Sequence, residues 1–367
     1  MSEIKISKIT NRAGTGSPDF NKGLNVEGSA SSILAPTRSD QVSEPDSADW
    51  ANGDTWWNDS AGTYAIRIND EWKYVIGEGD GSSSVTPWYG DLGVFMRYGT
   101  GNPMQYIDIT TTGNAQDFGD GVSTNRGMGG TADGSRGVWG GGNIDGTQIQ
   151  YITISSAGNA TDFGNLTSSR DDLGACSDAT YGVFWGGSNN TIDYITIQTT
   201  GDASDFGDNI GTQHRTACWS DGTTGLAAGF ASNSNQIHYI TIATTGNSAD
   251  FGDLTQARVR PACGGDDTRT MWAGGYLANT NQVNTIDYVT TGTAGNASDF
   301  GDLTTSRYWS SAVSNATRTV FGGGVDAGDV TLDYVTTQTT GNATDFGDML
   351  SNHGNRDMSS NVSGAAS

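Results

Sequence analysis

Ile192-Asp193-Tyr194-Ile195-Thr196-Ile197, with Asp205-Phe206-Gly207 after it, is the stretch of the chain that decides the fold. Its β-branched and aromatic residues alternate with polar ones at a period of two, which predicts a strand. The Tyr stands 11 residues before the Asp of Asp-Phe-Gly, and this pair recurs along the chain. Copies of Asp-Phe-Gly begin at Asp117, Asp162, Asp205, Asp250, Asp299 and Asp345, separated by 45, 43, 45, 49 and 46 residues. Six units of about 46 residues therefore follow one another.

The rest of each unit also has the character of short strands. Upstream of the Tyr, an apolar segment ends in glycines, as in Val183-Phe184-Trp185-Gly186-Gly187. Downstream of Asp-Phe-Gly, Leu-Thr-x-x-Arg segments such as Leu166 to Arg170 lead into a strand of small residues. Each unit thus holds at least three strands, with room for a fourth. A period of this length with several short strands is typical of propeller blades, so we predict an all-β fold with a six-bladed β-propeller over residues 88–367.

The two ends of this repeat region complement each other. The first unit begins early, at Val94-Phe95-Met96-Arg97, and lacks the strand that an Arg introduces in later units. The last unit is followed by a spare segment of that kind, Arg356 to Ser360. We therefore expect a C-terminal strand to complete the first blade and to close the ring, which leaves no sheet edge exposed.

Composition supports an all-β fold and limits the partners. After Glu78 the chain contains neither Lys nor Glu, two of the best helix-forming residues, while 54 of the 367 residues are Gly. The 18 Lys and Arg residues against 41 Asp and Glu residues give a net charge of −23, which repels phosphate and anionic lipid. We expect no nucleic-acid partner. We also expect no membrane insertion, because no segment approaches the roughly 18 apolar residues of a membrane span.

The N-terminus and the cysteines indicate where the chain is made. The first ten residues contain no apolar run that could form the core of a signal peptide. Three Cys cannot form a closed disulfide framework. We therefore expect synthesis in a reducing cytosol.

The repeated units resemble kelch-type propeller blades, in which an apolar strand ending in Gly-Gly precedes a Tyr-containing strand and then an aromatic residue. That aromatic residue is Phe here, where kelch repeats usually place Trp. We expect it to pack between blades and the flanking Asp residues to bond turn N–H groups. The six residues with this structural role are Phe118, Phe163, Phe206, Phe251, Phe300 and Phe346. The third unit departs from the pattern, with Gln213 where Arg is expected.

The motifs contain no recognisable catalytic or metal site. Asp-Phe-Gly is shared with the kinase magnesium motif, but six regular copies in a chain without Lys after Lys73 exclude a kinase site. The three His residues lack ligand spacing, and calcium-loop spacing of Asp residues is absent. The three Cys occupy similar blade positions and are interpreted as small buried residues. We therefore predict a protein that is not an enzyme, with no catalytic residues, metal or cofactor.

The first 87 residues differ from the repeats. We divide them into an arm over 1–30, a small Trp-rich β-module over 31–77 and a Gly/Ser linker over 78–87. Ser7 to Leu24 looks like the opening of bacteriophage tail-fibre and virion-appendage proteins, and the segment from Asn52 to Val75 is similar to a small Gly-Asp-x-Trp β-module found in such fibres. The resemblance implies an arm that docks onto other virion proteins. The candidate docking residues are Ile9, Arg12, Pro18, Phe20 and Leu24.

The resemblance implies a virion protein, made in the host cytoplasm, whose propeller attaches to a host cell-surface glycan or protein. The alternatives are a structural accessory or decoration protein of capsid or tail and, third, a glycan-cleaving propeller enzyme. The arm is compatible with a homo-oligomer, although no heptad run sets its order. The loops after the glycine-ended strands vary most between units and are rich in Asn and Asp. The candidate receptor-facing residues are Asn143, Asp145, Asn189, Asn190, Asn233, Asn235, Asn279, Asn281, Asp326 and Asp329.

Overall fold

The computed structural model divides the chain into two units, Met1–Val85 and Thr86–Ser367. In the first unit it describes four strands. In the second it describes residues 90–97, 99, 102–187, 189–211, 216–230, 234–277, 281–324, 330–350 and 362–364. Every regular element in the described residues is a β-strand.

The first unit contains one four-stranded sheet. Its strands are β1 (Ile4–Ile6), β2 (Thr55–Asn58), β3 (Thr63–Ile68) and β4 (Glu71–Gly77). The order across the sheet is β1-β4-β3-β2, and β1 pairs with β4 in parallel. The start of the predicted arm thus contributes a strand to the sheet of the Trp-rich module. The five candidate docking residues and the linker 78–87 lie outside the described residues.

The second unit is a six-bladed β-propeller, as predicted, with four strands in each blade. Blade A contains β5 (Leu92–Met96), β6 (Pro103–Asp108), β7 (Gln116–Asp120) and β28 (Val362–Gly364). Blade B contains β8 (Gly129–Ala132), β9 (Arg136–Gly140), β10 (Gln148–Thr153) and β11 (Thr161–Asn165). Blade C contains β12 (Leu173–Ser177), β13 (Tyr181–Gly186), β14 (Thr191–Thr196) and β15 (Ser204–Asp208).

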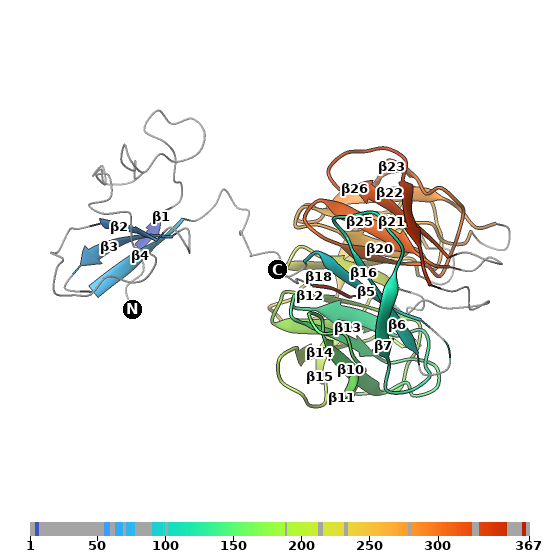
Figure 1. The fold of residues 1–367 in the computed structure, drawn as a ribbon, viewed down its shortest axis with the longest axis horizontal. Coiled ribbons are helices and arrows are strands. Elements are labelled where there is room, and N and C mark those ends of the chain that lie inside the picture. Colours follow the sequence, from blue (N-terminus) through green and yellow to red (C-terminus); the bar gives the residue numbers. More distant parts are fainter. Residues whose placement is uncertain are drawn as a thin grey trace. The chain divides into compact units, whose positions relative to one another are not determined.

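The remaining three blades repeat this arrangement (Figure 1). Blade D contains β16 (Ala217–Ser220), β17 (Thr224–Ala228), β18 (Gln236–Thr241) and β19 (Ala249–Asp253). Blade E contains β20 (Ala262–Gly265), β21 (Arg269–Ala273), β22 (Thr285–Thr290) and β23 (Ser298–Asp302). Blade F contains β24 (Ser311–Ser314), β25 (Arg318–Gly322), β26 (Thr331–Thr336) and β27 (Thr344–Asp348). The Asp-Phe-Gly block is therefore the fourth, outer strand of each blade.

A C-terminal strand closes the ring. β28 pairs with β5 in antiparallel register, Val362 opposite Val94, and so completes blade A from the far end of the chain. The first strands of successive blades contact one another and surround the axis of the propeller. The segment Arg356 to Ser360, from which this closure was predicted, lies outside the described residues.

The Phe of each outer strand packs between two blades. Phe118 lies in a cluster with Val94 of its own blade and with Trp139 and Ile152 of the next one. Its ring meets the ring of Tyr106, the Tyr 11 residues upstream of Asp117, edge to face at 6.0 Å. All six Phe–Tyr pairs have this geometry, which aromatic quadrupoles favour. Burial of Phe118 to 3% exposure makes it part of the apolar core that holds neighbouring blades together.

The Gly of each outer strand forms a backbone contact with the next blade, which we call the rim latch. Gly207 has φ 150°, and a Cβ there would collide with the carbonyl of Gly246 in the following blade. Gly246 N–H donates to the Phe206 carbonyl at 2.8 Å, and Asp208 N–H donates to Asn247 Oδ1 at 2.9 Å. The six latches join Gly119 to Gly158, Gly164 to Gly201, Gly207 to Gly246, Gly252 to Gly295, Gly301 to Gly341 and Gly347 to Gly113. The last of these ties blade F to blade A.

Candidate functional site

The two faces of the propeller are built differently. Because neighbouring strands in a blade are antiparallel, the loops between second and third strands emerge on the same face as the linkers between blades. We call this the loop face; its fully described segments include the loop 141–147 and the linkers 121–128, 166–172, 254–261 and 303–310. The opposite turn face carries short turns, at residues 133–135, 178–180, 221–223, 266–268 and 315–317, and the longer turns between third and fourth strands.

The turn face repeats one hydrogen-bonding device. Asp178 Oδ1 accepts the N–H of Thr180 at 2.9 Å and of Tyr181 at 2.7 Å. The same bonds start at Asp133, Asp221, Asp266 and Asn315. Side-chain bonding of this kind stabilises turns. The acceptors in these turns are thus four Asp residues and Asn315, whereas the sequence suggested the Asp residues beside Phe.

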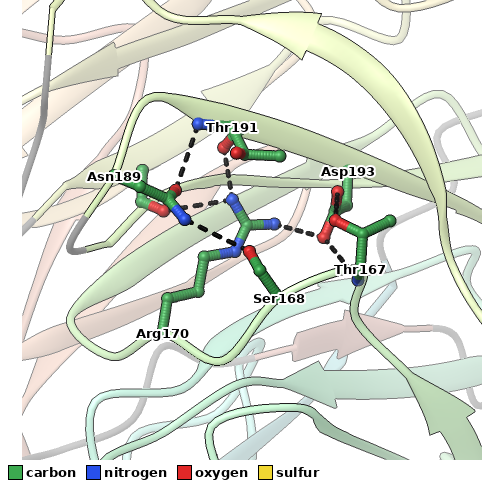
Figure 2. A network of polar contacts seen from close by, with 7 residues as sticks. Thr167, Ser168, Arg170, Asn189, Thr191 and Asp193 are labelled. Carbon is green, nitrogen blue, oxygen red and sulfur yellow. Dashed lines mark hydrogen bonds and ion pairs between the residues drawn. The ribbon is translucent and has the colours of Figure 1, made fainter.

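Below the loop face, blade C holds a buried ion pair (Figure 2). Arg170, in the linker before β12, donates from Nη2 to Asp193 Oδ2 of β14 at 2.6 Å, and both side chains are fully buried. Thr167 adds a hydroxyl bond to Asp193 Oδ1 at 2.7 Å. Nη1 of Arg170 donates to the carbonyls of Thr191 and Gly186. The pair fastens the linker to the blade that follows, and burial lowers the pKa of Arg170 although Asp193 opposes that shift.

This Thr–Arg–Asp set occurs in three of the six blades. Blade E has it as Thr255, Arg258 and Asp287, and blade F as Thr304, Arg307 and Asp333. The other blades change the whole set. The residues at the Asp position there are Gln105, Gln150 and His238, and those at the Thr position are Leu350, Val122 and Ile210. No blade pairs the Arg with a neutral residue, because a buried charge without its partner is costly.

The sequence-predicted loop residues are placed as follows. Asn143, Asp145, Asn190 and Asn281 are exposed on the loop face, and Asn189 and Asn235 are half-buried. Asn189 accepts the Thr191 N–H at 3.1 Å and donates to Ser168 Oγ at 3.1 Å, so its side chain shapes its own loop (Figure 2). Asp145 Oδ1 accepts from the Thr147 hydroxyl at 3.1 Å. The others, Asn233, Asn279, Asp326 and Asp329, lie outside the described residues.

Large apolar side chains are also exposed on this face. Ile144, between two of the predicted loop residues, is 63% exposed. Val122, Ile210 and Leu350, each at the Thr position of a linker, are 43%, 47% and 53% exposed. These four are the exposed large hydrophobic residues among the described part of the chain, and all lie on the loop face. That face therefore combines apolar and polar contact groups.

A cluster that the sequence did not point to lies where the linkers reach the axis. Arg260 Nη2 lies 3.4 Å from Asp172 Oδ2, although the two linkers belong to blades E and C. The Arg260 guanidinium carbon sits 3.5 Å from the ring centroid of Trp309. Trp309 stacks on Tyr308 at 5.4 Å, and Tyr308 meets Tyr276 at 5.0 Å. We call Asp172, Arg260, Tyr308, Trp309 and Tyr276 the mouth cluster, after the opening of the propeller axis. The first four are linker residues that stand within three residues of a strand that surrounds the axis, and Tyr276 comes from the neighbouring loop.

The backbone at this position is unusual. Asp172, Arg260 and Trp309 have φ of 55°, 57° and 55°, in the left-handed region that favours glycine. The corresponding residue before blade B is Gly127, with φ 69°. Hydrogen bonds link the positions around the mouth: Leu173 N–H donates to the Gly127 carbonyl at 3.4 Å, and Trp309 N–H to the Arg260 carbonyl at 3.1 Å. The left-handed backbone conformation is therefore a feature of the propeller at this position, and it is the same for glycine and for the three larger residues.

The alignment of the repeats offered one signal for this cluster. Two residues after each Arg of the Leu-Thr-x-x-Arg segments stand Asp172, Arg260 and Trp309, three unrelated side chains at one repeat position. The sequence could show that this position varies. It could not show that residues 88 positions apart meet there.

The described residues offer little for nucleophilic or metal chemistry. Burial raises the pKa of the Cys176, Cys218 and Cys263 thiols, which keeps them protonated. Among the residues that the structure describes, no three His, Cys, Asp or Glu side chains are grouped so as to hold a metal ion. The same part of the chain contains no helix long and apolar enough to cross a membrane.

No protein-family model matches the chain, and none of the curated proteins is detectably similar to it.

Proposed function

We propose that the protein is a non-enzymatic phage virion protein, a tail fibre or appendage, whose propeller attaches to the host surface through its loop face. The observation that carries this proposal is the contrast between the two faces. The turn face and rim repeat one device from blade to blade, as a scaffold does. The loop face gathers the residues that break the repeat, including the exposed Ile144 and the mouth cluster. Recognition residues characteristically lie on loops held by a rigid scaffold.

The rest of the proposal comes from the N-terminal sequence. Ser7 to Leu24 and the Gly-Asp-x-Trp segment resemble virion appendages, so the arm is the part that would dock onto the particle. The propeller region carries 11 Arg and 28 Asp from residue 88 on, a net charge of −17. This field disfavours nucleic acid and acidic polymers and leaves neutral glycans or proteins of the host surface as partners.

A structural accessory of capsid or tail is the second candidate. The exposed Ile144, Val122, Ile210 and Leu350 favour it, because large apolar groups on a surface often mark contacts with another protein. In that case the loop face would meet a virion protein, and binding to cells would be absent.

The test is binding of the labelled full chain to cells of candidate hosts. We expect saturable binding that unlabelled protein competes away and that slows phage adsorption. Ile144→Arg on the loop face should weaken it, whereas Ser156→Arg, an exposed position of the turn face, should leave it unchanged. Tight association with particles without cell binding would favour the accessory role. Release of reducing sugars from host polysaccharide would contradict a non-enzymatic function.

A further inference from the structure

We propose that the mouth cluster of Asp172, Arg260, Trp309, Tyr308 and Tyr276 is a binding site for a neutral saccharide. This inference rests on the proposed attachment function and specifies its ligand and its location. It starts from residues that stability alone does not explain.

The first step concerns the backbone. Arg and Trp are rarely found at positive φ, because their Cβ strains the backbone there and glycine does not. Gly127 shows that the propeller accepts glycine at the equivalent position. The chain nevertheless carries Asp172, Arg260 and Trp309 there. Side chains kept at strained positions, all three meeting in one cluster, indicate a role other than folding.

The second step concerns the indole of Trp309. Its Nε1–H is buried and has no hydrogen-bond partner in the structure. A buried donor without a partner destabilises the fold, because it has lost its hydrogen bond to water and gained none in return. Phe would stack on Tyr308 without that cost, so the cluster is not optimised for its own stability.

The third step matches the cluster to a ligand. The side chains of Arg260 and Asp172 remain 16% and 21% exposed, so solvent and a ligand can reach them. A guanidinium and a carboxylate held together offer donors and acceptors that suit adjacent hydroxyl groups. The neighbouring Tyr276 and Tyr308 are half-buried aromatic rings, which provide the apolar surface for the C–H face of a sugar. Few polar groups beside aromatic walls are typical of small-molecule sites.

The charges argue for a neutral sugar over an acidic one. Asp172 lies against Arg260 and offsets its charge locally. The surrounding propeller is strongly negative. An anionic ligand would meet both the Asp172 carboxylate and this field, whereas a neutral saccharide meets neither penalty.

The test uses the full chain and saturation-transfer NMR with calorimetry. The neutral probes are methyl glycosides of glucose, galactose, mannose and N-acetylglucosamine; glucuronate and inorganic phosphate are the anionic probes. The variants Arg260→Gly and Trp309→Gly place glycine where the backbone favours it, so they should fold. Arg269→Ala is the matched control, since Arg269 also lies over an aromatic ring, that of Tyr288 at 4.6 Å, but at the turn face.

We expect at least one neutral glycoside to bind and its affinity to fall about tenfold or more in Arg260→Gly and Trp309→Gly. Arg269→Ala should bind as the unmodified chain does. The melting temperature of Arg260→Gly should stay the same or rise. The proposal is overturned by binding of glucuronate or phosphate alone, by no binding to any neutral probe, or by binding that the two glycine variants leave intact. Cell binding that persists in both glycine variants would contradict the saccharide site but support the attachment function. Sugar binding without cell binding would support the saccharide site but contradict the attachment function.

Discussion

The rim latch and the Thr–Arg–Asp set perform the same task, joining a blade to its neighbour, but they vary in different ways. The latch is present in all six blades, and at its centre stands a glycine whose missing Cβ leaves room for the carbonyl of the next blade. The Thr–Arg–Asp set appears in three blades and is exchanged as a whole in the others. A contact between two backbones allows only one residue type, glycine, at its centre. A contact between side chains allows several combinations of residues, provided that buried charges and hydrogen bonds stay paired.

The largest expected effect comes from breaking one set without replacing it. Asp193→Gln would leave Arg170 buried beside a neutral group, and the loss of a buried partner costs about 3–5 kcal/mol. Blade B has Val122, Asn125 and Gln150 at the Thr, Arg and Asp positions. The combined change Thr167→Val, Arg170→Asn and Asp193→Gln installs this set in blade C, and we expect it to recover most of the loss. Urea unfolding of the two variants measures this. If the triple variant were as unstable as the single one, the sets would not be interchangeable units.

The next effect concerns the latch. Gly207→Ala places a methyl group against the Gly246 carbonyl at φ 150° and should destabilise the propeller by about 2–4 kcal/mol. Gly246→Ala, on the other side of the same latch, meets open space and should change stability by less than about 0.5 kcal/mol. Equal losses for the two variants, measured by thermal unfolding, would refute the steric account of the latch.

The smallest effect is the pH dependence of the set in blade D. His238 replaces the Asp, donates from its Nδ1–H to Asn209 Oδ1 at 2.9 Å, and is fully buried. Burial lowers its pKa below the usual 6.5, although Asp250 opposes the shift. His238 therefore binds a proton more tightly in the unfolded chain than in the folded chain. Protonation favours the unfolded chain, so the free energy of unfolding falls as the pH drops below about 6.5.

His238→Gln, with the residue that blades A and B use there, removes this contribution. We expect the unmodified chain to lose up to about 1 kcal/mol more than the variant between pH 7.5 and pH 5. Parallel denaturant titrations at the two pH values check it. Identical pH profiles would show that His238 titrates alike in the folded and unfolded chain.

The propeller could be predicted from local pattern because each blade repeats the same local information. The alternation around Tyr194 and the apolar run at Phe184 indicated two of the four strands directly. The outer strand Ser204–Asp208 was less evident, since its Asp and Gly residues have the composition of a turn. It becomes a strand because Phe206 is buried in the core and the rim latch completes its hydrogen bonding.

The candidate site was less accessible to sequence reasoning. Asn189 belongs to a variable loop, as expected, yet its amide bonds Ser168 and Thr191 within the blade. Composition can identify a polar loop but cannot tell which of its polar groups are engaged by the fold. Asp172 and Arg260 showed no pattern together because nothing in a linear repeat relates linkers that are two blades apart.

The sequence by itself determined the all-β class, the number of blades and the closing role of the C-terminus, because spacing and alternation are local properties that a repeat displays six times over. Only the tertiary structure decided which glycines meet across the rim, which buried charges are paired and which side chains gather at the mouth of the axis. Those contacts depend on how the blades pack around the axis. This packing brings together residues that are far apart in the sequence, such as Asp208 and Asn247, 39 positions apart, and Asp172 and Arg260, 88 positions apart.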